Sequence, residues 1–559
     1  MRFKIFRIIV RFGFIAIVFG LVQTQIVQGD YYHALSMNNR IRVVPIEGRR
    51  GRILDRNGVV IADNRASFDV MIIPQEIRDR EELFAHLSNT LAIPKEKLLK
   101  RFVQKKLAPF APVVIAEDIN KDQAIVLEEN KFRFPAVVVQ ANSKRFYPFA
   151  QTNAHLLGYV GKIDSSQMTE LKEYGYTMQS IVGKTGIEQY YDRYLKGEGG
   201  GLQIEVNNLG RQVRLLGLKE PMSGQDIALT VDQRVQQAAI DSLTGRRGAV
   251  VVMDLDTSEI IAMVSSPSFD PNNFVRGENL SDYFKNSNVP LLNRATNGQY
   301  PAGSVFKIID TIAGLETGKI NAHTSFSCPG FYQLGRRRFH CLHVHGLQDL
   351  MQGLAHSCNV YFYNVGNILG SEIMAQYARM FGLGTATGVD VFSEASGLIP
   401  SRKGKGDALN LAIGQGELLV TPIQLTCMIS RVANSGKEPQ PHFIRSINSM
   451  DVELKSLTAR PVHLKDKTFE ITKAALRDVV KSETGTARVL NIKDLEVSGK
   501  TGTAQSSGGR ASHAWFVGFC RSEKANIAFC VFLEHGGTSY YACEATKELL
   551  LRMKEQNIL

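Results

Sequence analysis

The stretch Tyr300-Pro301-Ala302-Gly303-Ser304-Val305-Phe306-Lys307 contains the only Ser-x-x-Lys of the chain. Pro301 and Gly303 stand directly before an apolar run with helical spacing, which predicts that Ser304 lies in the first turn of a helix. Residues three apart share a helix face, so the Lys307 amine should lie beside the Ser304 hydroxyl. A serine hydroxyl is a poor nucleophile until a base takes its proton, and Lys307 is placed to be that base. The stretch therefore predicts an acylatable serine at the start of a helix.

Two further motifs follow in the chain. Ser357-Cys358-Asn359 comes next, and Lys500-Thr501-Gly502-Thr503 comes last. Residues 495–504 read as a strand whose glycines let another backbone approach closely. A lysine acts as a base only if its pKa is lowered, which burial or a second cation would do, and Lys500 could be that cation. The backbone amide of Ser304, at a helix N-terminus, would favour a developing oxyanion.

Taken in this order, the three motifs resemble the set shared by penicillin-binding proteins and serine β-lactamases. Three upstream strings are similar to the non-catalytic pedestal of class B penicillin-binding proteins, and more to the elongation type than to the division type. They are residues 49–58 (RRGRILDRNG), residues 183–192 (GKTGIEQYYD), and Glu205-Val206-Asn207-Asn208 with Gly210-Arg211. No part of the N-terminal region resembles a glycosyltransferase domain, so the resemblance implies a transpeptidase alone.

The resemblance implies an α+β fold, in which an antiparallel sheet flanked by helices forms a transpeptidase domain like that of the serine β-lactamases. An elongated N-terminal pedestal and one transmembrane helix would precede it. In this fold Ser304 would be the nucleophile, Lys307 its base, Ser357 a proton relay, and Asn359 the residue that holds the peptide amide of the substrate. The Thr503 amide would complete the oxyanion hole, while Lys500, Thr501, Gly502 and Thr503 would bind a substrate carboxylate.

Short strings also recur by chance. Ser36-Met37-Asn38 and Ser446-Ile447-Asn448 fit Ser-x-Asn, and Lys184-Thr185-Gly186 fits Lys-Thr-Gly. Each departs from the expected order or spacing, and Lys184 runs into a helix-like segment. We expect all three to lie outside the catalytic site, because one short motif alone carries little information.

The N-terminus reads as a membrane anchor. Arg2, Lys4, Arg7 and Arg11 precede an apolar run from Phe12 to Val22, continued by Ile26 and Val27, with no acidic residue before Asp30. No small-x-small cleavage pattern follows, which favours an uncleaved anchor over a removed signal peptide. Basic residues before the span place the N-terminus in the cytoplasm and the residues after Gln28 outside it. The alternative is a buried core helix, since the uncharged run is shorter than the ~20 residues that span a bilayer.

The whole chain is long enough for two domains at 559 residues, 44% of them hydrophobic and 21% charged. We expect a cytoplasmic tail and anchor over residues 1–28, a pedestal over 29–225 and the transpeptidase domain over 226–559, where residues 248–253 and 260–264 read as a β-hairpin. The net charge of +12 comes without a basic stripe or a nucleic-acid motif. A basic surface would suit an anionic membrane and an acidic wall polymer, and an ordinary mixed surface is the alternative.

Three of the seven cysteines and a histidine gather in one short segment of the sequence. Cys328, Cys341, His345 and Cys358 form a set suited to structural zinc, with His340 and His343 as alternative histidines. The resemblance to zinc-binding members of the elongation type favours His345. A disulfide or buried free thiols are the other interpretations. The remaining cysteines, Cys427, Cys520, Cys530 and Cys543, sit in apolar contexts and are expected in the core.

These features predict a membrane-anchored D,D-transpeptidase. Ser304 would attack the D-Ala-D-Ala bond of a peptidoglycan stem peptide, and a neighbouring amine would then take the acyl group. β-Lactams would acylate the same serine. The family usually acts with a SEDS-type glycosyltransferase, which the resemblance alone implies as a partner. A carboxypeptidase or β-lactamase is the rival enzyme, and a β-lactam sensor or wall-binding scaffold is the rival from another class, although no signalling region is visible before residue 12.

Overall fold

The structure is a computed structural model of the 559-residue chain. It describes residues 2–32, 41–106, 111–178, 180–206, 212–278, 280–391, 393–402, 404–452, 461–506 and 508–559. The Ser36 motif and the string members Asn207, Asn208, Gly210 and Arg211 lie outside these ranges.

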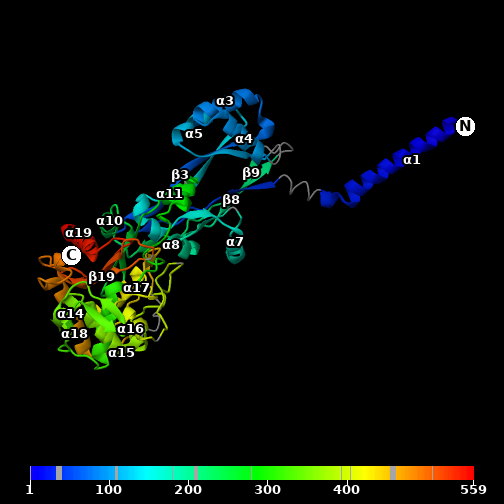
Figure 1. The fold of residues 1–559 in the computed structure, drawn as a ribbon. Helices are drawn as coiled ribbons and strands as arrows, with labels where there is room; N and C mark the ends of the chain where they lie inside the picture. Colours follow the sequence, from blue (N-terminus) through cyan, green and yellow to red (C-terminus); the bar gives the residue numbers. More distant parts are fainter. Residues whose placement is uncertain are drawn as a thin grey trace. The chain divides into compact units, whose positions relative to one another are not determined.

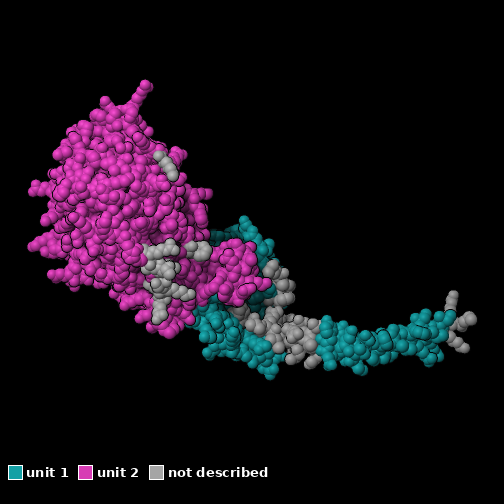
Figure 2. All heavy atoms as spheres, turned by 90° about the horizontal axis from the view of Figure 1, so that it is seen from below, with its two compact units in different colours: residues 1–51, 64–144, 196–224 teal, residues 52–63, 145–195, 225–559 magenta. Residues whose placement is uncertain are grey.

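The described chain forms two compact units that alternate along the sequence (Figure 2). Unit 1 comprises residues 1–51, 64–144 and 196–224, and unit 2 comprises residues 52–63, 145–195 and 225–559. Gln225 begins the last stretch of unit 2, next to the expected boundary. Two segments that precede this boundary, residues 52–63 and 145–195, nevertheless cluster with the catalytic residues. The division into residues 29–225 and 226–559 stays a prediction.

The N-terminal helix has the length and composition of a membrane span. Helix α1 (Arg2–Val22) continues into a π-helical turn, η1 (Gln23–Val27). The candidate span runs from Ile5 to Val27 with a mean hydropathy of 2.3, and none of it is buried within the structure. A soluble core helix would hide this apolar surface, so the exposed span agrees with the predicted single anchor.

Unit 1 contains two small β-structures. Strands β1 (Ile41–Ile46), β8 (Gly200–Val206) and β9 (Gln212–Lys219) form an antiparallel sheet in the order β1-β8-β9. Residues 68–72 of β3 (Val60–Ile72) pair with β4 (Val113–Ile119), and β5 (Val137–Phe146) also pairs with β3. Helices α3 (Arg80–Leu91), α4 (Lys95–Lys105) and α5 (Lys121–Glu129) contribute Leu87, Leu98 and Leu127, in this order, to a separate hydrophobic core. The 3-10 turn η2 (Pro74–Glu76) precedes α3.

Unit 2 is built on a five-stranded antiparallel sheet in the order β12-β11-β21-β20-β19. The strands are β11 (Gly248–Asp254), β12 (Ile260–Ser266), β19 (Glu496–Ala504), β20 (His513–Arg521) and β21 (Asn526–Leu533). The predicted hairpin over residues 248–264 is therefore confirmed. Nearly every residue of β11, β20 and β21 is buried, so the sheet is covered on both faces.

Helices supply that cover (Figure 1). Helices α10 (Gln233–Asp241) and α19 (Ser539–Glu555) contact each other and the sheet, as do α17 (Pro422–Ala433) and α18 (Asp466–Lys481). Helices α14 (Leu350–Ala355), α15 (Asn359–Met380) and α16 (Lys405–Ala412) gather with α18 beyond the sheet. This helical group supports the second catalytic motif, because α14 ends and α15 begins on either side of Ser357.

The remaining described elements of unit 2 are short. The helices are α6 (Ala154–Leu157), α7 (Ser165–Leu171), α8 (Gly186–Tyr190), α9 (Asp192–Leu195), α11 (Pro271–Arg276), α12 (Leu280–Lys285) and α13 (Lys307–Glu316). The 3-10 turns are η3 (Ala150–Asn153), η4 (Lys172–Tyr174), η5 (Gly303–Phe306) and η6 (Arg488–Leu490). The paired strands are β6 (Val160–Lys162) with β7 (Ile181–Gly183), β13 (Phe326–Cys328) with β16 (Gly346–Gln348), and β14 (Phe331–Leu334) with β15 (Arg337–His340). Strands β18 (Met450–Asp451), β17 (Ile444–Ile447), β10 (Ile227–Leu229) and β2 (Ile53–Leu54) lie in this order, and β2 pairs with residues 60–62 of β3.

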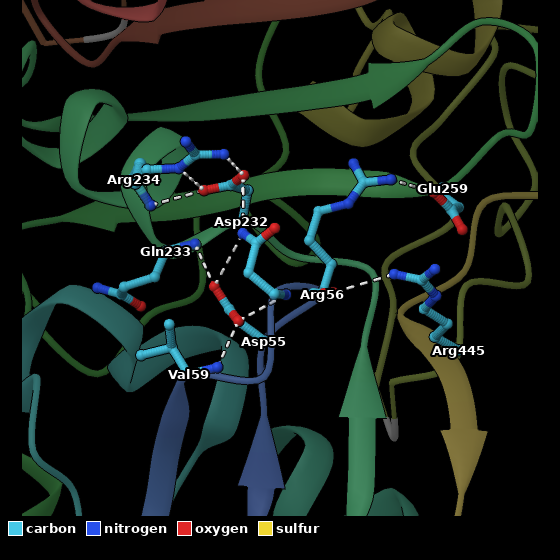
Figure 3. A network of polar contacts seen from close by, with 9 residues as sticks. Asp55, Arg56, Val59, Asp232, Gln233, Arg234, Glu259 and Arg445 are labelled. Atoms are coloured by element: carbon cyan, nitrogen blue, oxygen red, sulfur yellow. Dashed lines mark hydrogen bonds and ion pairs between the residues drawn. The ribbon is translucent and has the colours of Figure 1, made fainter. Parts of the chain in front are cut away.

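A buried carboxylate fastens the predicted Asn-Gly turn to unit 2 (Figure 3). Asp55 is only 1% exposed and follows β2, which is antiparallel to β3 as expected. Its carboxylate accepts hydrogen bonds from the amides of Asn57 and Val59, both at 2.8 Å, and of Gln233 at 3.1 Å. Since Gln233 is the first residue of α10, one side chain both closes the turn and holds it against a helix that packs on the sheet.

An ionic layer surrounds this turn (Figure 3). Arg56 donates to Glu259 at 2.9 Å, and its carbonyl oxygen accepts from Arg445 at 3.0 Å. Asp232 caps α10 and pairs with Arg234 at 2.7 Å. The string 49–58 thus includes residues that tie a short N-terminal segment to the catalytic unit.

Candidate active site

Ser304 lies where three parts of unit 2 meet. It is half-buried in the 3-10 turn η5, which leads directly into α13, so the predicted helical start is confirmed with a tighter first turn. The Gly303 amide donates to the Gly414 carbonyl at 2.9 Å. Gly303 has a φ of 56°, and a Cβ there would lie 2.7 Å from the Thr503 carbonyl oxygen. Glycine accommodates both the positive φ and this close approach, and because it has no side chain, the turn that contains Ser304 can lie against β19.

Lys307 joins the first two motifs. Its residue is fully buried, and its Nζ donates to the Ser357 carbonyl oxygen at 2.8 Å, to Ser357 Oγ at 3.2 Å and to Asn359 Oδ1 at 2.8 Å. The ring of Phe362 lies 5.3 Å away on α15. Three acceptors therefore fix the amine at the first turn of α13, beside the segment that bears Ser304.

Burial sets the protonation of this amine. It lowers the pKa of Lys307 from 10.5 to about 8, while the nearby thiols Cys341 and Cys358 and the carboxyl of Asp310 act in the opposite direction. Asp310 is itself fully buried, and its two oxygens have no hydrogen-bond partner among the described residues. Burial accordingly raises the pKa of Asp310 well above its ordinary value, although Lys307 acts to lower it. A lysine with a pKa near 8 is partly neutral at physiological pH and can accept a proton.

The second motif is held in a strained loop. Ser357 has a φ of 54°, which is unusual for a residue with a side chain. The Ser357 amide donates to the Leu354 carbonyl at 3.1 Å, and the Cys358 amide donates to the Gly353 carbonyl at 2.8 Å. Cys358 Sγ accepts from the Tyr361 amide at 3.4 Å and so caps α15. Strain of this kind persists only where surrounding contacts determine the backbone, as they do here.

The third motif lies on strand β19, as predicted, and this strand contacts the turn η5. A Cβ on Gly502 would lie 2.9 Å from Val305 and 3.0 Å from the Ala302 carbonyl oxygen, so this glycine permits the close approach expected from the sequence. Lys500 is fully buried, and its Nζ donates to the Thr501 carbonyl at 3.1 Å and to Thr501 Oγ1 at 3.3 Å. Thr503 is exposed and available to a ligand.

Each of the two buried lysines disfavours the charged form of the other, because like charges repel. Burial and the Lys307 charge together lower the pKa of Lys500 well below its ordinary value. For Lys307, burial is the main cause of the lowered pKa. Burial therefore leaves part of Lys307 neutral and able to accept a proton, and a contribution from the Lys500 charge stays a prediction. A bound carboxylate would restore the charge of Lys500, because an opposite charge favours the ammonium.

The cysteine and histidine segment forms one compact group. The ligand atoms of Cys328, Cys341, His345 and Cys358 all lie within 4.8 Å of one another. His345 Nδ1 is 3.6 Å from Cys328 Sγ and 3.5 Å from Cys341 Sγ. His340 and His343 do not share this group. All seven cysteines lie in the described ranges and are free thiols, and Cys427, Cys520, Cys530 and Cys543 are buried as predicted.

The thiol group is connected to the second motif. The Asn359 amide donates to Cys341 Sγ at 3.2 Å, and hydrogen bonds from Cys358 and from backbone amides lower the pKa of Cys341 to about 3. The same thiol contact, together with burial, raises the pKa of Cys358. A thiolate at Cys341 is thus favoured beside Asn359, whose side chain also accepts a hydrogen bond from Lys307.

The two chance matches within the described residues lie elsewhere, as expected. Lys184 lies just before α8, and its Nζ donates a hydrogen bond to Asp164 at 3.0 Å. Ser446 lies in β17, within the sheet that contains β10. The motifs give no sign of the buried Asp310, although its position three residues after Lys307 places both on one face of α13.

The chain is similar to proteins of known families. The family "Penicillin binding protein transpeptidase domain" matches residues 248–553, and "Penicillin-binding Protein dimerisation domain" matches residues 45–229. The peptidoglycan D,D-transpeptidase MrdA of Acinetobacter baumannii is 33% identical over 95% of this chain and 85% of its own length. The chain belongs to the penicillin-binding protein 2 family of class B transpeptidases.

Solved penicillin-binding protein 2 structures have the same fold. The protein in the complex of penicillin-binding protein 2 and MreC from Helicobacter pylori superposes with a TM-score of 0.79 at 28% identity, covering 93% of this chain and all of that one. A chain of a peptidoglycan synthase complex that coordinates polymerization and crosslinking superposes with a TM-score of 0.73 at 28% identity, covering 98% of each. The α+β transpeptidase architecture with a preceding dimerisation-type region, predicted from the motifs, is confirmed. The penicillin-binding protein 2 relatives and the one candidate membrane helix among the described residues together fit a single-pass membrane protein.

Proposed function

We propose that this penicillin-binding protein 2 relative is a peptidoglycan D,D-transpeptidase that acts through an acyl-enzyme on Ser304. The observation that carries the proposal is the buried amine of Lys307. It is fixed by Ser357 and Asn359 and has a pKa lowered to about 8. Acyl transfer requires a base of this kind, and Lys307 begins α13 directly after the turn that contains Ser304.

The first half-reaction releases D-alanine. Lys307 takes the Ser304 proton as Oγ attacks the penultimate D-Ala carbonyl carbon, and the negative charge develops on the carbonyl oxygen. The amides of Ser304 and Thr503 are the donors that would stabilise this oxyanion. The C–N bond then breaks, and the proton passes from Lys307 through Ser357 to the leaving amine, which fits the Lys307–Ser357 distance of 3.2 Å.

The second half-reaction forms the cross-link. An acceptor amine attacks the ester carbonyl and gives one proton to Lys307, which returns it to Ser304 Oγ as the ester C–O bond breaks and a new peptide bond results. Asn359 would hold the donor peptide through its amide. Lys500, Thr501 and Thr503 would hold the terminal carboxylate, and this interaction ends when D-alanine departs.

Covalent labelling tests the nucleophile. Penicillin should form one adduct per chain, and mass spectrometry should locate it on the peptide that contains Ser304. Ser304→Ala should remove the adduct, whereas Ser446→Ala, in a chance motif, should retain it. An adduct that persists in Ser304→Ala refutes the assignment. Incubation of wild type with a donor and an amine acceptor should then yield a cross-linked peptide.

Hydrolysis is the second candidate reaction, because water in place of the amine gives a carboxypeptidase or β-lactamase. The relation to MrdA favours transfer. A stable penicillin adduct and more cross-linked than hydrolysed product at saturating acceptor support the transpeptidase. Rapid turnover of the adduct supports the hydrolase, and acylation without either product supports a sensor or scaffold.

Topology and partners extend this proposal. The basic residues before the span favour a cytoplasmic N-terminus, with the residues after Gln28 in the periplasm of a bacterial cell. One solved relative is a complex with MreC, and another belongs to a peptidoglycan synthase complex. We therefore expect a SEDS-type glycosyltransferase as partner, and co-purification from membranes with such an enzyme would test it.

Structural zinc is the cofactor that the thiol group fits best. A tetrahedral ion bound at about 2.3 Å by sulfur and about 2.0–2.1 Å by nitrogen places these ligands about 3.6 Å apart. The two sulfur–nitrogen separations at His345, 3.6 and 3.5 Å, match this value. When bound, zinc would hold Cys358 in place, and with it the adjacent Asn359, whose amide also donates to Cys341 Sγ. Metal analysis should find about one zinc per chain, lost in Cys341→Ser and retained in the matched core variant Cys530→Ser. Zinc retained in Cys341→Ser would show that the ligands are others.

A further inference from the structure

The β14–β15 hairpin carries a concentration of positive charge that the reaction above does not use. Its strands pair from Phe331 with His340 to Leu334 with Arg337, which leaves a two-residue turn of Gly335 and Arg336. The φ of 57° at Gly335 suits the first position of such a turn. Arg336, Arg337 and Arg338 follow one another at its tip, and all three are exposed.

Aromatic rings of the hairpin hold two of these arginines. The guanidinium carbon of Arg338 lies 4.6 Å from the centre of the Phe331 ring, and that of Arg337 lies 4.8 Å from the Phe339 ring. Arg338 Nε also donates to Gln333 at 3.2 Å. Stacking limits the rotamers of an arginine while it leaves most N–H groups free for an anion. The hairpin therefore presents its cations in a partly ordered arrangement.

These charges are not neutralised within the described part of the chain. None of the three arginines forms an ion pair with a described carboxylate, whereas other exposed arginines of unit 2 do, as Arg402 does with Glu417 at 2.9 Å. Three adjacent unpaired cations repel each other, and a bound anion would relieve that repulsion. The hairpin is thus suited to an acidic ligand from outside the chain.

The base of the hairpin is part of the catalytic site. The carbonyl oxygen of His340, the last residue of β15, accepts from Asn359 Nδ2 and from the Tyr363 hydroxyl, both at 3.4 Å. Phe339 is buried against the Tyr363 ring at 5.6 Å. Asn359 Oδ1 in turn accepts from Lys307 at 2.8 Å. Four strand residues extend about 13 Å, so the arginines stand within the length of a few peptide residues of Asn359.

We propose that the β14–β15 hairpin binds internal carboxylates of the peptidoglycan stem peptide. This inference rests on the proposed transpeptidase function and adds the part of the substrate that lies beyond the reacting bond. A guanidinium recognises a carboxylate with two parallel hydrogen bonds. The length of the four-residue strands sets the distance between the arginines at the tip and Asn359 at the base of the hairpin. The donor and the acceptor peptide both offer such carboxylates, and separate assay arms distinguish them.

The test uses the full-length protein in detergent with charge reversal of all three arginines, R336E/R337E/R338E. Synthetic stem peptides are prepared with internal carboxylates free or amidated. In the donor arm, D-alanine release is followed against donor concentration. In the acceptor arm, the ratio of cross-linked to hydrolysed product is followed against acceptor concentration. The matched control is K97E/K100E/K121E, which changes three exposed lysines of unit 1 and alters the net charge by the same amount.

The variant should raise the half-saturating concentration of the free-carboxylate peptide by about tenfold or more in at least one arm, since each exposed ion pair contributes roughly 1.5- to 5-fold. The amidated peptide and the control variant should each show less than about a twofold change. Triple replacement by lysine should retain part of the affinity, because the charge stays while the bidentate geometry is lost.

Acylation by a small penicillin separates this proposal from the transpeptidase function. It should be unchanged in R336E/R337E/R338E, because the drug lacks the internal carboxylates. Equal losses with free and amidated peptides, an equal loss in the control, no change in either arm, or a loss of penicillin acylation would each overturn the hairpin proposal. Wild-type protein that binds penicillin but releases no D-alanine would instead overturn the proposed function.

Discussion

The protonation of Lys307 predicts how the rate of acylation depends on pH. Burial lowers the pKa of this amine from 10.5 to about 8, a difference that corresponds to about 3 kcal/mol against the charged form. Only neutral Lys307 can take the Ser304 proton. Its neutral fraction is about 1% at pH 6, about 9% at pH 7, about 50% at pH 8 and about 91% at pH 9.

The second-order rate constant for acylation by a penicillin should follow these fractions. It should rise about ninefold from pH 6 to pH 7, about fivefold from pH 7 to pH 8, and less than twofold from pH 8 to pH 9. An ordinary lysine with a pKa near 10.5 would instead give a rise of nearly tenfold per pH unit up to about pH 9.5. This rate constant refers to the free protein, which is the state whose geometry places Lys307 against Ser357 and Asn359.

Stopped-flow measurement with a fluorescent penicillin, corrected for hydrolysis of the drug, provides the assay. Lys473→Met is the matched control. Burial also lowers the pKa of Lys473, but this residue lies on α18 outside the catalytic motifs, so its loss should leave the profile unchanged. A flat profile between pH 6 and pH 9 would refute Lys307 as the base. A rise that continues unbroken above pH 9.5 would refute the role of burial.

Three further variants test the supports of the site. Gly303→Ala should slow penicillin acylation about a hundredfold, because a Cβ would lie 2.7 Å from a carbonyl oxygen of β19 and displace the serine turn. The matched control is Gly318→Ala. Gly318 has a φ of 68° and an added Cβ would meet no atom within 4 Å, so this variant should retain the rate of acylation. Asp55→Asn should lower the free energy of unfolding by about 2 kcal/mol in denaturant titrations, because an amide replaces a carboxylate that accepts from three backbone N–H groups. The control Asp256→Asn changes an exposed carboxylate and should alter the free energy of unfolding by less than about 0.5 kcal/mol. Asp310 has a raised pKa in the folded state, so its favourable contribution is present at low pH and is lost as pH rises. The melting temperature of Asp310→Asn minus that of wild type should therefore increase from about pH 5 to about pH 8, and a constant difference would contradict the assignment.

The sequence was sufficient for features that depend on local pattern. The helical start at Ser304, the strand of residues 495–504 and the hairpin of residues 248–264 follow from residue spacing, and the structure has all three. The glycine requirement at Gly502 also followed from its place in a strand. These features share one cause, because periodicity and glycine content reflect the immediate surroundings of each residue.

Features that depend on long-range packing could not be predicted in the same way. Burial of Lys307 arises because α15 and the loop of Ser357 cover it, and nothing in residues 300–307 reports that cover. The alternation of the two units has a similar origin. Residues 52–63 join unit 2 because Asp55 accepts from Gln233, nearly two hundred positions later, and local composition contains no trace of that hydrogen bond.

The loop of Ser357 is the point at which separate constraints converge on the reaction. Its carbonyl and hydroxyl position Lys307, Cys358 begins α15, and Asn359 contacts both Cys341 and the base of the arginine hairpin. A loop with a φ of 54° at Ser357 has no intrinsic preference for this shape. Its geometry must therefore come from these neighbours, so a change in the thiol group or in the hairpin base reaches Lys307 through one or two hydrogen bonds. Variants of the thiols should for this reason alter the pH profile of acylation even though none of them contacts the substrate, whereas variants at the hairpin tip should alter substrate affinity alone.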